Sequence, residues 1–355
     1  MTSLARPARA HAGVRFASDV SGGGRLGRVA AVAAVLAMLS WPRFLLAHGG
    51  HGGPDEPLPF DALILLFGMM PSGLRLDIVL VLAVAAGIYL TGWVRLRGQA
   101  EGAATVTGLL LYLGGIAALA VSLVSPVDRL AAERLSMHMV QHILLLMIAP
   151  LGILLANPFP VVLWGLPGGL RESFAGLFRD GRPGRSVLTA LTSIPVAWTL
   201  YVVNLWGWHH PALYQAALRY WWVHDLEHWL FFATAVLFWW PILNAAPLYR
   251  PARPLGTRVV YLLAATLQNT LLGMSIAVPE RILYPFYAAV PGLAALSPIQ
   301  DQGLGGGIMW VSGHMYVIPI LVLVARRLIS EDEAANARDG AANGGVPLGS
   351  GGSVR

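Results

Sequence analysis

The sequence predicts an all-α fold, a polytopic bundle of transmembrane helices. Mean hydropathy is +0.63, 56% of the residues are hydrophobic and only 12% are charged, whereas a soluble domain needs a more charged surface. Seven apolar segments are each long enough to cross the bilayer as a helix, which satisfies its own backbone hydrogen bonds in lipid. They are 74–93, 104–124, 136–156, 187–205, 222–243, 259–278 and 307–324.

Residues 1–47 form a basic leader in front of this bundle. Five arginines precede the apolar run 29–39, an order typical of a secretory signal peptide. Because Leu45 is not small, the cleavage signature is imperfect, and a retained N-terminal anchor helix stays an equal alternative. We expect 48–73 to be an outer His/Gly/Pro segment, 74–327 the seven-helix membrane domain and 328–355 a disordered cytoplasmic tail.

The arginines predict the orientation of the chain. The net charge of +6 could indicate a nucleic-acid-binding protein, but the arginines fall in short loops between apolar runs, where they act as topology signals. With the end of the first helix in the cytoplasm, the inner loops hold eleven arginines and the outer connections five. This bias predicts an extracytoplasmic N-terminus and a cytoplasmic C-terminus.

The sequence contains no cysteine. Disulfides, iron–sulfur clusters and thiolate sites for zinc or copper are therefore excluded. A metal ion bound by this chain must use histidine, methionine, carboxylate or backbone oxygen as its ligands.

Two histidine pairs are the clearest functional signal. His138 and His142 begin the third predicted helix, and His224 and His228 begin the fifth. Residues four apart share one face of a helix, about 5.4 Å from each other. Both helices run inward, so each pair lies within roughly the outer 10 Å of its helix. His314, near the start of the seventh segment, is expected at a similar depth.

If the third, fifth and seventh helices are neighbours, up to five imidazoles meet near the outer surface. Imidazole without thiol suits copper, while imidazole with carboxylate also suits zinc, iron or nickel. The flanking methionines favour copper, although methionine is also common core filler. Carboxylates that could hydrogen-bond the second nitrogen of a ligating histidine are Asp225, Glu227 and Asp301.

Single histidines at helix ends are usually hydrogen-bonding residues. For His209, His210, His48 and His51 we favour that role, or loose recruitment of metal at the flexible His-Gly-Gly-His segment. For the two pairs the balance reverses, because the same spacing at the same depth favours ligation or proton transfer over packing.

Three motifs resemble the CtaG-type cytochrome c oxidase assembly proteins, polytopic membrane proteins of aerobic bacteria. The motifs are Ser136-Met-His138-Met-Val-Gln141-His142, His224-Asp-Leu-Glu227-His228 and Asp301-Gln302 with Gly306-Gly307-Ile-Met309-Trp310. The likeness spans roughly 74–327 and extends more distantly to copper-resistance proteins of the CopD type. It implies a seven-helix bundle in the bacterial inner (plasma) membrane, a role with cytochrome c oxidase subunits, and function at His138, His142, His224 and His228.

The leading hypothesis is therefore a non-enzymatic assembly factor that binds copper on its outer face and helps to load an oxidase subunit. A redox protein with a bis-histidine b-type haem between the third and fifth helices is the first alternative, although one histidine of each pair would then be surplus. A copper transporter or resistance protein is the second. Below the outer histidines, however, the third and fifth helices offer little besides Met147 for an ion to follow.

Overall fold

The computed structural model describes residues 75–99, 104–247, 251, 253–289 and 296–343. Within these ranges the chain is helical and contains no strand, which confirms the predicted fold class. Six helices are long and apolar enough to span a membrane, and a bent helix pair would make a seventh span. The leader and the His48/His51 segment lie outside the described residues.

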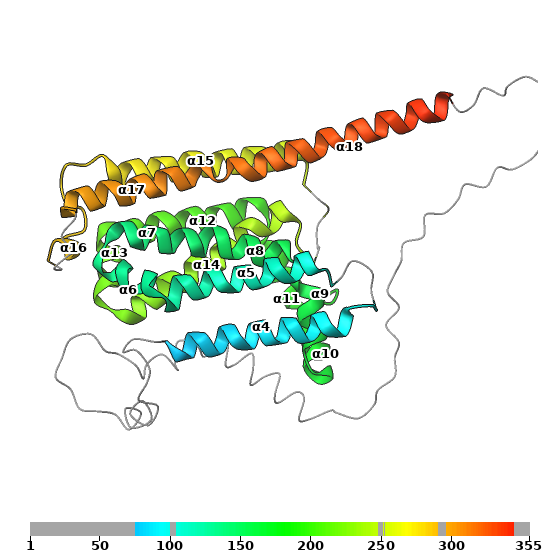
Figure 1. Cartoon of the computed structure of the whole chain (residues 1–355), viewed down its shortest axis with the longest axis horizontal. Helices are drawn as coiled ribbons and strands as arrows, with labels where there is room; N and C mark the ends of the chain where they lie inside the picture. Colours follow the sequence, from blue (N-terminus) through cyan, green and yellow to red (C-terminus); the bar gives the residue numbers. More distant parts are fainter. Residues whose placement is uncertain (1–74, 100–103, 248–250, 252, 290–295, 344–355) are drawn as a thin grey trace, which may run out of the picture.

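The long helices run side by side, and short helices join them at both ends (Figure 1). At one end, called the α6 end, lie α6, α13 and α16; at the other lie α9, α10 and α11. The helices are α4 (Leu76–Leu96), α5 (Val106–Val124), α6 (Pro126–Glu133), α7 (Leu135–Ile143), α8 (Ala149–Leu155), α9 (Pro158–Gly165), α10 (Gly168–Leu177), α11 (Pro183–Leu191), α12 (Ile194–His209), α13 (Pro211–Arg219), α14 (Trp221–Leu243), α15 (Leu255–Ala277), α16 (Phe286–Ala289), α17 (Pro298–His314) and α18 (Val317–Asn343).

Two predicted spans differ from the sequence expectation. The fourth is broken, because α11 and α12 meet at a bend of 67°. The seventh begins at Pro298 instead of 307, since Ser297 and Gln300 form a capping box and the glycines that follow lie inside the helix. Its continuation, α18, also reaches Asn343 and so runs through much of the tail predicted to be disordered.

The third span, Leu135–Leu155, contains a π-helical turn at Leu144–Ile148 between α7 and α8. The turn precedes Pro150, which has no N–H to donate to the carbonyl of Leu146 one turn earlier. Trp239 of α14 donates its indole N–H to that carbonyl at 3.0 Å. The bond replaces a lost helical hydrogen bond and joins the third span to α14.

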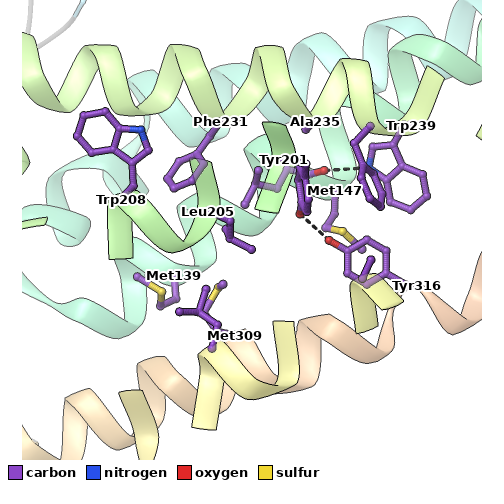
Figure 2. Close-up of a cluster of buried hydrophobic side chains, with 14 of the residues drawn as sticks. Met139, Met147, Tyr201, Leu205, Trp208, Phe231, Ala235, Trp239, Met309 and Tyr316 are labelled. Carbon is purple, nitrogen blue, oxygen red and sulfur yellow. Dashed lines mark hydrogen bonds between the residues drawn. The ribbon is translucent and has the colours of Figure 1, made fainter. Parts of the chain in front are cut away.

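The interior away from the α6 end is filled with large apolar side chains. Met139 of α7 and Met309 of α17 belong to this buried cluster, and Tyr201 and Tyr316 share a hydrogen bond of 2.5 Å within it (Figure 2). Trp239 is fully buried at the same level. The core therefore closes the bundle below the predicted histidine site.

Close backbone contact between α15 and α17 depends on glycine. A Cβ atom on Gly306 would lie 2.4 Å from the backbone nitrogen of Ala277, and one on Gly273 would lie 2.5 Å from that of Trp310. Such small-residue contacts are typical of packed transmembrane helices. Asn269 strengthens the pair by donating to the carbonyl of Met309 at 2.6 Å.

Gly306→Ala should therefore destabilise the protein by about 1–3 kcal/mol, because the new methyl group meets backbone that cannot rotate away. Thermal unfolding of the purified protein in detergent measures the effect. Gly307→Ala is the control, since a Cβ there meets nothing within 4 Å. Equal unfolding temperatures for the two variants would show that the α15–α17 contact is looser than described.

Candidate metal centre

The two histidine pairs meet at the α6 end of the bundle, as the sequence predicted. The ring centroid of His138 on α7 lies 5.2 Å from that of His224 and 5.9 Å from that of His228, both on α14. Within the pairs the centroids are 4.4 Å apart on α7 and 4.0 Å apart on α14. Four imidazoles from two separate spans thus form one contiguous cluster.

One set of four side chains has the arrangement of a metal site. His138, His142, Glu227 and His228 each offer one ligand atom, and these atoms lie within 4.8 Å of one another. The Nε2 atoms of His138 and His142 are 3.9 and 3.6 Å from the carboxylate oxygens of Glu227. All four side chains are buried. We call this set the inner group.

The polar atoms of the inner group lack the hydrogen bonds that buried atoms normally have. Among the described residues, no partner is found for Nε2 of His138, Nε2 of His228, either ring nitrogen of His142 or either carboxylate oxygen of Glu227. Leaving a buried polar atom unpaired costs about 1–3 kcal/mol. Four of these side chains' atoms, one from each residue, lie close together, and the arrangement is explained if they bind a cation that accepts one lone pair from each.

A tyrosine fixes the tautomer of His138. Tyr287 donates its hydroxyl proton to the carbonyl of Ala131 at 3.0 Å, and its oxygen lies 3.0 Å from Nδ1 of His138. The hydroxyl of Tyr287 has one proton, and that proton is donated to Ala131. Nδ1 of His138 must therefore carry a proton and donate it to the oxygen of Tyr287. The Nε2 atom is then left with a free lone pair toward Glu227, the form that a metal ligand needs.

His209 lies beside the inner group and was not expected there. Its ring centroid is 5.3 Å from that of His142, and it is buried at the end of α12. Nδ1 donates to the carbonyl of Leu205 at 2.7 Å, so Nε2 carries a free lone pair and has no partner among the described residues. Its neighbour His210 has the simple role predicted for it: it is exposed and caps α13 through Ala212.

The acidic residues have different roles from those expected. Asp225 pairs with Arg75 at 3.0 Å, and Asp301 accepts hydrogen bonds from the backbone of Leu135 and the hydroxyl of Ser136. Asp301 therefore caps the first turn of α7, and neither it nor Asp225 contacts a histidine of the inner group as an outer-shell partner. Glu227, expected as an outer partner, lies within the inner group itself.

A second set of possible ligands adjoins the inner group. Asp128 of α6, His224 and His228 offer atoms that lie within 4.8 Å of one another. Asp128 and His224 are partly exposed, whereas His228 is buried. Burial raises the pKa of Asp128 to about 6, against the opposing effect of a hydrogen bond from Gln141. No motif or spacing in the sequence selects Asp128. We call this set the outer group.

His314 does not belong to either set. It lies thirteen residues after Asp301 on α17, so it is about 20 Å further along the helix from the start of α7. Its ring is exposed, and Nδ1 donates to the carbonyl of Trp310 at 3.2 Å. The expected depth was wrong because α17 begins nine residues before the predicted start of the seventh span, 307.

Comparison with known proteins agrees with the motifs. The sequence model of the cytochrome c oxidase caa3 assembly factor family (Caa3_CtaG) matches residues 87–331, which include the inner group and the outer group. The chain belongs to this family. The match begins inside α4 and ends inside α18, so it covers the described bundle except the first half of α4 and the C-terminal part of α18.

Curated relatives come from mycobacteria. The chain is 29% identical over 274 residues to uncharacterized proteins of Mycobacterium bovis and Mycobacterium tuberculosis, which is 74% of this chain and 39% of theirs. An uncharacterized protein of Mycobacterium leprae is 28% identical over 270 residues, covering 72% of this chain and 39% of its own length. The chain thus spans about two fifths of the relatives that it matches. No solved structure matches it.

Glu227→Gln should leave the metal-free protein at least as stable as the wild type, because it removes a buried carboxylate that has no hydrogen-bond partner. Asp301→Asn is the matched comparison. That buried carboxylate accepts two hydrogen bonds, so its loss should cost about 1–3 kcal/mol. Thermal unfolding after chelator treatment measures both. A strongly destabilised Glu227→Gln protein would mean that the carboxylate is bonded in the metal-free state.

Proposed function

We propose that this protein is a membrane assembly factor for cytochrome c oxidase that binds copper at the inner group and assists its delivery to, or insertion into, an oxidase subunit. Family membership supports the oxidase as the partner. The buried, unpaired ligand atoms of His138, His142, Glu227 and His228 carry the copper proposal. The role is that of a binding and transfer protein and not of an enzyme.

The chemistry of the ligand set favours copper over other divalent ions. Three imidazoles and one carboxylate form an N/O site, and intrinsic affinities at such sites rise along the first-row series to a maximum at Cu²⁺. Zinc, nickel and iron fit the same atoms less tightly. The chain has no thiol to replace an imidazole.

The packing of the rings argues against the haem alternative. A bis-histidine haem needs its two axial rings on opposite sides of a flat macrocycle. Here His138 contacts His142 edge to face with ring centroids 4.4 Å apart, and its centroid is also 5.9 Å from that of His228. The rings already occupy the space between α7 and α14, so no slot for a porphyrin is left between them.

The packed interior argues against transport through the bundle. Beyond the inner group lie Phe231, Leu205 and Met147, all buried in the apolar core (Figure 2). An ion pathway needs polar or ionisable groups at successive depths. Delivery from the same end at which the ion enters fits this arrangement better.

The proposed site faces outward in the bacterial plasma membrane. Arg95 at the end of α4, Arg171 in α10 and Arg185 in α11 lie at the α9 end of the bundle, and a cytoplasmic position for them follows from the positive-inside rule. The α6 end with both groups then faces the extracytoplasmic side, from which an external ion can reach it.

The double variant His142→Ala with His228→Ala should lose stoichiometric copper binding, measured as bound copper per purified protein in detergent. His314→Ala is the matched control, because it removes an imidazole outside both groups. In cells the double variant should also fail to support active oxidase, while the control does so. Copper retained by the double variant would refute the proposed site. Loss of copper in His314→Ala would place the copper ligands near His314 instead.

Tyr287→Phe should weaken copper binding by about 10–100-fold, because it removes the acceptor that holds His138 in its ligating tautomer. Competition with a chelator of known affinity gives the change. Tyr284→Phe is the control, since that hydroxyl bonds only the backbone carbonyl of His209. Affinities that fall equally in both variants would indicate a general loss of packing at the α6 end.

A further inference from the structure

The outer group differs from the inner group in exposure. Asp128 and His224 are partly exposed at the α6 end, whereas all four residues of the inner group are buried. His228 belongs to both sets. A buried site with no exposed ligand needs a route by which an ion loses its water without a large barrier, and the outer group lies at the start of such a route.

We propose that Asp128 and His224 form an entry site, which captures the ion from the outer solution and passes it through His228 to the inner group. This inference rests on the proposed copper function. Because His228 offers a ligand to both sets, the ion can exchange one protein ligand at a time. At no point must it leave every protein ligand behind, so the costly state of a bare ion in apolar surroundings is avoided.

The contacts around Asp128 join the entry site to the helix that carries the inner ligands. Gln141 lies between His138 and His142 on α7, and its amide donates to Asp128 Oδ1 at 2.7 Å and to the carbonyl of Ser122 at 2.8 Å. The carboxylate is therefore held in one position beside His224, ready to bind. If Asp128 served only to accept the hydrogen bond from Gln141, it would not need the imidazoles of His224 and His228 beside it.

The charge next to the entry site also suits a cation. Arg75 of the same end binds Asp77 at 2.8 Å and Asp225 at 3.0 Å. With both carboxylates ionised, this trio carries a formal charge of −1. Arg75 is therefore matched by two carboxylates, so its charge is compensated and does not by itself oppose a cation at Asp128.

The test is the rate of copper loading. Metal-free full-length protein in detergent is mixed with Cu²⁺, samples are passed over a chelating resin at set times, and retained copper is measured by mass spectrometry. Asp128→Asn keeps the acceptor oxygen for Gln141 but removes the charge, and His224→Gln removes the imidazole. Glu133→Gln is the control, because it removes a carboxylate from the same helix outside both groups.

Asp128→Asn and His224→Gln should each load about tenfold more slowly than the wild type. Both should reach the same final copper content, because the inner group is intact, and Glu133→Gln should load at the wild-type rate. Wild-type rates in both entry variants would overturn the entry site while leaving the copper function standing. A wild-type protein that retains no copper would overturn the proposed function and this inference with it.

Discussion

The burial of imidazole and carboxylate in an apolar helical bundle is the constraint on which the rest of the structure depends. The inner group places six polar atoms in the protein interior without hydrogen-bond partners among the described residues. Such an arrangement is unfavourable by several kcal/mol unless a ligand compensates it. The surrounding structure must hold these side chains in place, because nothing in their own pairing does so.

That support comes from bonds around the group. Tyr287 orients His138, and the carbonyl of Leu205 orients His209. Further away, Trp239 joins α14 to the third span at the carbonyl that Pro150 leaves free. The two histidine-bearing helices are thus fixed to each other on the inner side of the site, while Tyr287 holds His138 from α16, and a preorganised ligand set requires such rigidity.

Hydropathy and spacing predicted the helical bundle and the meeting of the two histidine pairs, since both follow from local pattern and chain direction. The bend between α11 and α12 and the start of α17 were missed because hydropathy does not report local helix-start signals such as the Ser297–Gln300 capping box. Glu227 was expected beside the site and not in it, because sequence places it on α14 but does not give its rotation toward α7. Asp128 and Tyr287 come from connecting segments, whose position is set by the packed helices.

The cap that Asp301 provides for α7 joins residues 165 and 166 positions apart. During synthesis the third span is made long before α17. Until α17 follows, the first turn of α7 lacks the cap from Asp301. The first turn of α7, which leads into His138, therefore gains its cap only after α17 has been made.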